Sequence, residues 1–352
     1  MPLSSEKSKA ASDMTTTVTD PRLQALTHWL HQVIAPSEGL SLTAVSGDAS
    51  FRRYFRARQG ERSWIVMDAP PAKEDCHPFC AIAEQWRHCG VNVPEIFAED
   101  HDQGFLLLSD FGDDLLLGLL NEDSADRLYR QAIDHLLAIQ ICEQPALHPL
   151  PPYDRALLAR EMELFRDWLV TQKLGLDLSA DEHQLLDKSF EQLINNALEQ
   201  PQVCVHRDYH SRNLLLSPQR EIAVLDFQDA VMGPITYDLV SLLRDCYVSW
   251  PQEQVRTWAL YYLSEATEQG LTQAKPSQFL RWFDLMGVQR HLKAAGIFAR
   301  LSIRDGKHGY LKDVPRTVGY IDSVLANYPE FEAFHRWLQA RVLPALSQLS
   351  AG

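Results

Sequence analysis

The polar residues best suited to catalysis lie between positions 206 and 228. The segment reads His206-Arg207-Asp208-Tyr209-His210-Ser211-Arg212-Asn213 and, after a dozen residues, Leu225-Asp226-Phe227-Gln228. An aspartate followed five residues later by an asparagine suits phosphoryl transfer, because Asp208 can orient an attacking hydroxyl and accept its proton, while Asn213 offers an oxygen to Mg²⁺. Asp226 supplies the hard anionic oxygen that Mg²⁺ prefers. This spacing predicts an enzyme that transfers a phosphoryl group.

Short strands are predicted to position these residues. Val203–His206 and Ile222–Leu225 are short apolar runs, which are typical of buried strands. Each group of polar residues follows one of these strands, so Asp208 and Asp226 are expected close to strand ends.

The remaining pattern predicts two lobes and an α+β fold. Residues 21–108 combine a helix, Arg22–Val33, with five short strands and a second helix, His77–Cys89, whereas residues 109–352 are mainly helical. We predict a small five-stranded antiparallel lobe followed by a larger helical lobe. Residues 1–20 are rich in Ser, Thr and Ala without an apolar run, which is typical of a disordered leader and not of a signal peptide.

The composition restricts the partners of the protein. The chain has 352 residues and a formal charge of −14, which argues against a nucleic-acid surface, because such surfaces neutralise phosphates with Lys and Arg. No run of about 18 apolar residues occurs, which excludes a membrane span. The six cysteines form no C-x-x-C pair, so neither a zinc cluster nor a dense disulfide framework is expected. We expect a cytoplasmic monomer.

The H-R-D-x-x-x-x-N spacing followed by L-D-F resembles the aminoglycoside phosphotransferase/choline kinase-like family of small-molecule kinases, which share the bilobal protein-kinase fold. Further segments resemble one branch of it, the kinases that phosphorylate the anomeric C1 hydroxyl of N-acetylmuramate and N-acetylglucosamine in peptidoglycan recycling. These segments are Gly47–Tyr54, Met67–Pro71, Asp226–Ala230, Gly233–Leu239 and Gln289–Lys293. The resemblance implies ATP and Mg²⁺ as cofactors and a small amino sugar as acceptor.

The resemblance also implies roles for individual residues. Asp208 would be the catalytic base, and Asn213 and Asp226 the metal ligands. Leu108, Ser109 and Asp110 fall where the hinge of the family contacts adenine. Small residues in a loop let backbone N–H groups approach phosphates. The triphosphate loop would comprise Ser46, Gly47, Asp48, Ala49, Ser50, Phe51 and Arg52.

The third strand departs from the family pattern. Kinases hold the α- and β-phosphates with a lysine on this strand, but here it reads Trp64-Ile65-Val66-Met67-Asp68. Arg52, Arg53 or Arg56 could supply the missing cation. We choose Arg52 because it lies nearest the turn.

The residues around Asp208 allow a second interpretation. His206 and His210 flank it as H-x-D-x-H, and imidazoles would suit zinc, but no further His/Asp cluster is spaced to complete such a site. We predict that His206 is structural and that His210 is structural or contacts the substrate. Asp238 begins an apolar helix, where the helix dipole favours an anion, and it is expected to brace the catalytic loop.

A basic stretch lies near the C-terminal side of the chain. Arg281–Arg316 holds eight basic and three acidic residues, which suits either a solvated helix face or a site for an anionic substituent. N-acetylmuramate carries a carboxylate that an arginine or lysine would pair with, whereas polycationic aminoglycosides would prefer an acidic cleft. Asp229 suits either substrate contact or loop support. The residues assigned to the acceptor are His210, Gln228, Asp229, Arg290 and Lys293.

Three alternatives remain open from the residues alone. Another small-molecule kinase, with an aminoglycoside, choline, thiamine or homoserine acceptor, would keep Asp208, Asn213 and Asp226 but change the acceptor pocket. A metallohydrolase would need zinc and no ATP. A non-catalytic nucleotide-binding pseudokinase would bind ATP without turnover, and the missing strand lysine is the feature that favours it.

Overall fold

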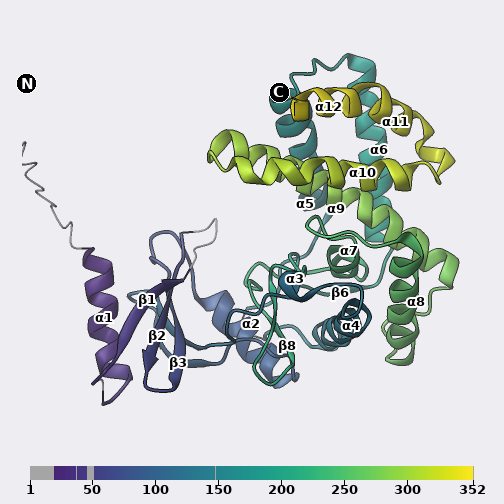
Figure 1. Ribbon diagram of the computed structural model, residues 1–352. Helices are drawn as coiled ribbons and strands as arrows, with labels where there is room; N and C mark the ends of the chain where they lie inside the picture. The colour runs from purple at the N-terminus through teal and green to yellow at the C-terminus, as the bar shows by residue number, and fades with distance from the viewer. Residues whose placement is uncertain (1–19, 37, 46–50, 147, 352) are drawn as a thin grey trace, which may run out of the picture. The chain divides into compact units, whose positions relative to one another are not determined.

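The computed structural model describes residues 20–36, 38–45, 51–146 and 148–351. The leader up to residue 19 and five residues of the predicted triphosphate loop, Ser46, Gly47, Asp48, Ala49 and Ser50, lie outside this part. The chain divides into two structural units (Figure 1). One comprises Met1–Glu74 and Ala98–Leu107, and the other comprises Asp75–Phe97 and Leu108–Gly352.

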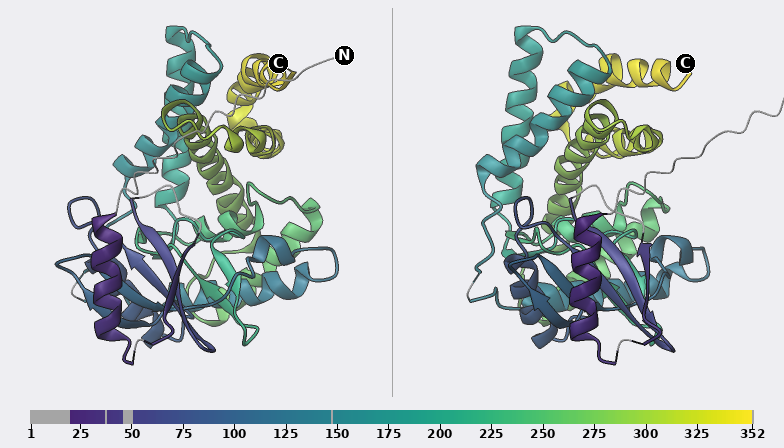
Figure 2. Two further views of the ribbon diagram at one scale, coloured as in Figure 1. Left: turned by 60° about the vertical axis from the view of Figure 1, so that its left-hand side comes forward. Right: turned by 90° about the vertical axis from the view of Figure 1, so that its left-hand side faces the viewer.

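The smaller unit is built on a five-stranded sheet with the strand order β1-β2-β3-β5-β4. The strands are β1 (Ser41–Val45), β2 (Arg53–Gln59), β3 (Arg62–Asp68), β4 (Ile96–Asp100) and β5 (Phe105–Ser109). Helix α1 (Pro21–Val33) lies along the sheet (Figure 2). Its apolar stripe of Leu26, Trp29 and Leu30 packs with Phe55 and Val66 in one core. Burying each of these side chains contributes about 2 kcal/mol, so the core holds the helix on the sheet.

Asp68, at the end of β3, is fully buried and paired with two arginines. Arg22 Nε donates to Oδ1 of Asp68 at 2.9 Å, and Arg53 Nε donates to Oδ2 at 2.9 Å. A buried carboxylate needs such partners, because an unpaired buried charge is strongly destabilising. Asp20 pairs with Arg53 and caps α1 through the N–H of Arg22. Asp20, which we had assigned to the disordered leader, is therefore an ordered helix cap.

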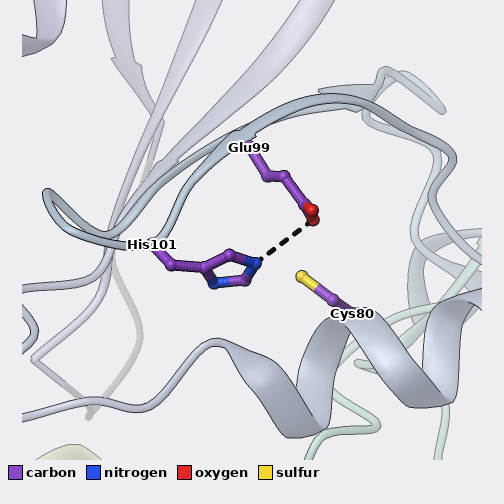
Figure 3. A group of neighbouring side chains, drawn as sticks. All are labelled: Cys80, Glu99 and His101. Atoms are coloured by element: carbon purple, nitrogen blue, oxygen red, sulfur yellow. Dashed lines mark ion pairs between the residues drawn. The ribbon is translucent and has the colours of Figure 1, made fainter.

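The turn between β4 and β5 passes close to the end of β3. The N–H of Ala69 donates to the carbonyl oxygen of Gly104 at 2.8 Å. Gly104 has φ of 71°, and a Cβ at this position would lie 1.9 Å from the carbonyl oxygen of Ala69, so glycine is required both by conformation and by space. Beside this turn, a carboxylate oxygen of Glu99 lies 3.4 Å from Nε2 of His101 (Figure 3).

The larger unit is mainly helical. Its α-helices are α2 (His77–His88), α3 (Leu116–Leu119), α4 (Ala125–Ile141), α5 (Arg155–Leu164), α6 (Ala180–Leu198), α7 (Tyr237–Leu243), α8 (Gln252–Glu268), α9 (Pro276–Arg304), α10 (Val314–Leu325), α11 (Glu332–Trp337) and α12 (Leu343–Ala351). Shorter π- and 3₁₀-helical segments are η1 (Phe165–Lys173), η2 (His308–Asp313), η3 (Pro329–Phe331) and η4 (Leu338–Val342). Two antiparallel strand pairs join β6 (Gln202–Val205) to β9 (Val231–Pro234) and β7 (Leu214–Leu216) to β8 (Ile222–Val224).

Helix α9 runs through the interior of this unit, beside α5, α6 and α10 (Figure 1). It is 29 residues long, and most of its central residues are buried. Arg290 and Lys293 lie there and are only 5% and 7% exposed. A solvated helix face therefore does not explain these two charges, although it does suit Arg304, which is exposed on the same helix.

The predicted lobe 21–108 differs from the observed division in residues 75–97 and in Leu108. Residues 75–97, which include α2, belong with the larger unit, because Phe79 stacks on Phe227 with 4.7 Å between ring centroids and Trp86 packs against the His206 ring. Cys89, just after α2, also forms a disulfide with Cys142, which follows α4 in the same unit. The sequence offered no signal for this pairing, because 53 positions separate the two cysteines.

The predicted α+β fold is confirmed, and most predicted elements lie within a few residues of the observed ones. Strands β7 and β9 were missed, since runs of three or four residues give too little periodicity to recognise. Helix α5 begins at Arg155 and changes to a π-helix at Phe165. No helix in the described part of the chain is long and apolar enough to cross a membrane.

Candidate active site

Asp238 fixes the backbone at the start of the loop that carries the H-R-D-x-x-x-x-N motif. Its fully buried carboxylate accepts hydrogen bonds from the backbone N–H groups of His206, at 2.6 Å, and Arg207, at 3.0 Å. Arg207 has φ of 77°, a left-handed conformation that costs a non-glycine residue about 1–2 kcal/mol. The two hydrogen bonds offset this cost and hold the chain immediately before Asp208.

His206 links this loop to the end of the neighbouring strand. Its Nε2 lies 2.8 Å from the carbonyl oxygen of Leu225, and its Nδ1 lies 3.2 Å from the backbone N of Asp208. Because a carbonyl can only accept and a backbone N–H can only donate, the ring carries its proton on Nε2. Both ring nitrogens are thus engaged, which leaves neither for a zinc ion.

Asp208 is half-buried and surrounded by positive charge. Burial favours the neutral acid, but Lys293 foremost, together with Arg290, outweighs it and lowers the pKa of Asp208 to about 2. The carboxylate is therefore ionised at neutral pH and can only accept hydrogen bonds. This is the state required of a group that orients a hydroxyl donor.

Asn213 and Asp226 are brought together by the β7–β8 pair. The N–H of Leu225 donates to the carbonyl oxygen of Asn213 at 2.9 Å, directly beyond the paired residues Leu214 and Val224. The side-chain amide of Asn213 donates from Nδ2 to the carbonyl oxygen of Asp208 at 3.0 Å, so its Oδ1 is left to accept. An amide oxygen and a carboxylate at the ends of two paired strands form a donor set that fits Mg²⁺.

Gln228 supports the second of these ligands. Its Nε2 donates to Oδ1 of Asp226 at 2.8 Å, and Asp226 has φ of 63°. Hydrogen bonds of this kind orient a metal-ligating carboxylate. The structure therefore places Gln228, which we predicted at the substrate, on Asp226.

The other two residues of the catalytic segment assigned to substrate lie in different surroundings. His210 is half-buried, its Nδ1 has no partner among the described residues, and burial lowers the pKa of the ring. Asp229 is exposed, and its carbonyl oxygen lies 3.4 Å from NH1 of Arg207. Of these two residues, His210 is the one with a buried side-chain atom that no described residue satisfies.

Glu161 is a buried acid that joins three elements around the catalytic loop. From α5, its Oε1 lies 2.6 Å from NH2 of Arg207 and 3.1 Å from Nζ of Lys293 on α9, and its Oε2 accepts from the hydroxyl of Tyr153. Burial raises the pKa of Glu161, but Lys293 and Arg207 outweigh that effect and lower it. Lys293 also donates to the hydroxyl of Tyr237 at 2.9 Å. Lys293 therefore already has an ion-pair partner within the protein.

Arg290 differs from Lys293 in this respect. It is buried, NH1 lies 3.8 Å from Sγ of Cys246, and Nε has no partner among the described residues. No carboxylate in the described part of the chain forms an ion pair with it, although it interacts electrostatically with Asp208. A buried guanidinium with donors to spare is suited to an anionic group of a ligand.

The residues assigned to the nucleotide are described only in part. Arg52 is 9% exposed, with Nε 3.8 Å from a carboxylate oxygen of Glu74, and the exposed Phe51 donates its N–H to Glu74 at 3.1 Å. Leu108 is buried, and Ser109 bonds both ways with the backbone of Glu95. Asp110 accepts from the N–H of Gly112 at 3.0 Å. These contacts fix the backbone on both sides of Ser109.

Comparison with known proteins decides the class of enzyme. The model of the Phosphotransferase enzyme family matches residues 41–276, which is more than half of the chain. The chain belongs to this family of phosphotransferases. The transfer chemistry predicted from the Asp208, Asn213 and Asp226 spacing is thus that of the family.

Relatives of this phosphotransferase cover nearly its whole length. A Pseudomonas putida protein named N-acetylmuramate/N-acetylglucosamine kinase is 47% identical over 88% of this chain and 94% of its own. A protein of the same name from Neisseria meningitidis is 40% identical over 89% and 94%. Among solved structures, an ethanolamine kinase of Plasmodium vivax has a TM-score of 0.61 at 11% identity, covering 84% of this chain and 86% of its own. A choline kinase of Streptococcus pneumoniae has a TM-score of 0.58 at 12% identity, covering 86% and 99%. At these identities the two structures show a common fold.

Sequence reasoning missed one acid in the phosphotransferase site. Glu161 lies among Leu158, Met162 and Phe165, which are all buried and recur at helical spacing. A charged residue on the apolar side of a helix needs a buried partner, so this pattern was the available signal. The identity of its partners was not readable, because Arg207 and Lys293 are distant in sequence.

Proposed function

We propose that this phosphotransferase is an ATP- and Mg²⁺-dependent kinase that phosphorylates the anomeric C1 hydroxyl of N-acetylmuramate and N-acetylglucosamine. The observation that carries the substrate is the common name of relatives that are 40–47% identical over most of this chain. The proposal places the protein in the cytoplasm as a monomer and in peptidoglycan recycling, where these amino sugars are reused.

Asp208 is proposed to act on the acceptor hydroxyl. Its ionised carboxylate orients the C1 hydroxyl and accepts its proton as the oxygen bonds to the γ-phosphorus of ATP and the bond to the ADP oxygen breaks. An anomeric hydroxyl is more acidic than an ordinary alcohol, so a base with a pKa of about 2 suffices to orient it. His206 and Asp238 hold the backbone of this residue in place.

Asn213 and Asp226 are proposed to hold Mg²⁺. Asn213 offers Oδ1, because its Nδ2 is bound to the carbonyl oxygen of Asp208. Asp226 offers its carboxylate, which Gln228 orients. When bound, Mg²⁺ neutralises the negative charge of the phosphates. For the nucleotide we propose the loop from Ser46 to Arg52 and the backbone of Leu108–Asp110.

Arg290 is proposed to recognise the carboxylate of N-acetylmuramate. It is buried without an ion-pair partner among the described residues, whereas Lys293 forms an ion pair with Glu161. A charge-assisted hydrogen bond to a carboxylate contributes about 1.5–3 kcal/mol. This difference leads us to choose Arg290 over Lys293 for the contact. N-acetylglucosamine, which lacks the carboxylate, would bind without it.

An ATP-consumption screen tests the proposed function. The purified protein is incubated with ATP, Mg²⁺ and one of four acceptors: N-acetylmuramate, N-acetylglucosamine, choline or kanamycin. We expect turnover with the two amino sugars only, and the product should carry phosphate on C1 by ³¹P NMR. Asp208→Asn serves as the matched control and should lose about 10²–10⁴-fold in kcat. Turnover with choline or kanamycin instead would replace the substrate, and hydrolysis of ATP without any acceptor would reject the kinase.

A further inference from the structure

Two mostly buried cations, Arg207 and Lys293, interact with the same carboxylate, that of Glu161. Glu161 Oε1 accepts from Arg207, the residue before Asp208, and from Lys293 on α9. Side chains at both ends of these contacts are mostly buried: Glu161 is 6% exposed, Lys293 9% and Arg207 21%. Water therefore screens the attraction between Glu161 and the two cations only weakly, and this attraction strongly influences where the cations lie.

Lys293 has a second anion within its electrostatic reach. Its positive charge is the largest of the charge effects that lower the pKa of Asp208, and Asp208 in turn raises that of Lys293. The ammonium group of Lys293 is held by Glu161, at 3.1 Å, and by the hydroxyl of Tyr237, at 2.9 Å. If the ammonium group moved onto Asp208, it would occupy the oxygens that the substrate hydroxyl needs.

We propose that Glu161 is a positioning residue for phosphoryl transfer: it holds Lys293 in place, so that the carboxylate of Asp208 stays free for the acceptor. The inference rests on the proposed role of Asp208 as the group that orients the acceptor hydroxyl. Glu161 touches neither substrate in this account and acts through Lys293 alone. Its substitution should therefore lower kcat and leave the KM for ATP unchanged.

The test is a double-mutant cycle in the N-acetylglucosamine assay. Glu161→Gln keeps the size of the side chain but leaves Lys293 without its anion, and we expect kcat to fall at least tenfold while the KM for ATP changes less than twofold. In a Lys293→Met background the released cation is absent, so the same Glu161→Gln change should cost less than threefold. Glu163→Gln is the matched control, because Glu163 lies on the same helix and pairs with Arg166 at 3.2 Å; it should keep full activity.

The smaller cost of Glu161→Gln in the Lys293→Met background separates a positioning role from a merely structural one. A structural carboxylate would be needed in both backgrounds, so a Glu161→Gln cost of tenfold or more in Lys293→Met would overturn the inference, as would full activity of folded Glu161→Gln. If Glu161→Gln alone does not fold, the comparison of Lys293→Met with the double variant still decides. Thermal unfolding midpoints can be measured without an acceptor. The double variant should unfold at a higher temperature than Glu161→Gln, because it no longer contains a buried Lys293 without its anion. A lower midpoint of the double variant would overturn the inference. A wild-type protein inactive on both sugars, with the midpoints ordered as expected, would instead reject the proposed function.

Discussion

The backbone N–H of Arg207 donates a 3.0 Å hydrogen bond to Oδ1 of Asp238, which lies 31 positions further along the chain. Asp238 Oδ2 accepts from His206 in the same way. A carboxylate can accept at both oxygens, whereas an asparagine would turn its NH₂ toward one of these N–H groups. The relationship makes Asp238 the acid on which the shape of the catalytic loop depends.

The first prediction concerns the pH dependence of activity. Burial raises the pKa of Asp238 to about 6, whereas the pKa of Asp208 is lowered to about 2. Activity should therefore fall as the pH decreases through about 6, because protonated Asp238 has one hydrogen-bond acceptor fewer for the loop. Asp208, which stays ionised in this range, should not contribute to this acidic limb of the profile. Because the folded-state pKa is raised, the contribution of protonated Asp238 to stability is complete below about pH 4 and is lost as the pH rises through 6.

Profiles of kcat between pH 5 and 8 check this assignment. Asp238→Asn should lower kcat about tenfold at pH 7.5, equivalent to about 1.4 kcal/mol, and should lack the acidic limb. A variant profile that keeps the same limb would assign the titration to another group.

The second prediction concerns the metal. Asp226→Asn removes the anionic ligand and should raise the Mg²⁺ concentration for half-maximal activity at least tenfold, whereas Gln228→Met, which only releases Asp226 Oδ1, should raise it a few-fold. Loss of an outer-shell partner typically costs 10–100-fold in metal affinity or activity, and Gln228→Met is expected to cost less than this because Gln228 supports one of two ligands. Titration of activity with Mg²⁺ measures both, and an unchanged Mg²⁺ requirement in Asp226→Asn would remove it from the metal site.

The third prediction separates two adjacent arginines. Arg53 is held by Asp68 and Asp20, whereas Arg52, the last residue of the proposed triphosphate loop, lies 3.8 Å from Glu74. Arg52→Ala should raise the KM for ATP with little effect on the thermal midpoint. Arg53→Ala should lower the midpoint, because it leaves the buried Asp68 with one cation fewer. An Arg52→Ala protein with an unchanged KM for ATP would show that another group supplies the cation missing from β3.

The fourth prediction compares two glycines of the smaller unit. Gly104 and Gly60 both have positive φ, but a Cβ on Gly104 would lie 1.9 Å from Ala69 O, whereas no atom of the described residues would lie within 4 Å of a Cβ on Gly60. Gly60→Ala should cost about 1–2 kcal/mol for the left-handed backbone, and Gly104→Ala should cost more, because the chain must also move. Urea unfolding of both variants measures the difference, and equal costs would show that the turn relaxes without strain.

Residues of the site were predictable where a local sequence pattern marks them, and not where their role depends on contacts between distant helices. Asp208, Asn213 and Asp226 lie in a fixed spacing next to the two predicted strands, so their proximity was predictable, although β7, which follows Asn213, was too short to recognise. The partners of Glu161 were not, because they depend on how α5 and α9 pack. The same limit applied to Arg290 and Lys293, which look alike in the sequence. Only the packed structure shows that Lys293 pairs with Glu161, whereas Arg290 has no ion-pair partner among the described residues.

The last prediction uses that difference between Arg290 and Lys293. Arg290→Met should lower kcat/KM for N-acetylmuramate at least tenfold, about 1.4 kcal/mol, and should change the value for N-acetylglucosamine less than threefold, because only the first sugar carries the carboxylate. Arg281→Met is the matched control on the same helix, since Arg281 is 42% exposed and pairs with Glu330; it should leave both values unchanged. Paired assays of the two sugars with each variant give the ratio directly. Equal losses toward both sugars in Arg290→Met would assign the arginine to the charge balance around Asp208 and not to the substrate carboxylate.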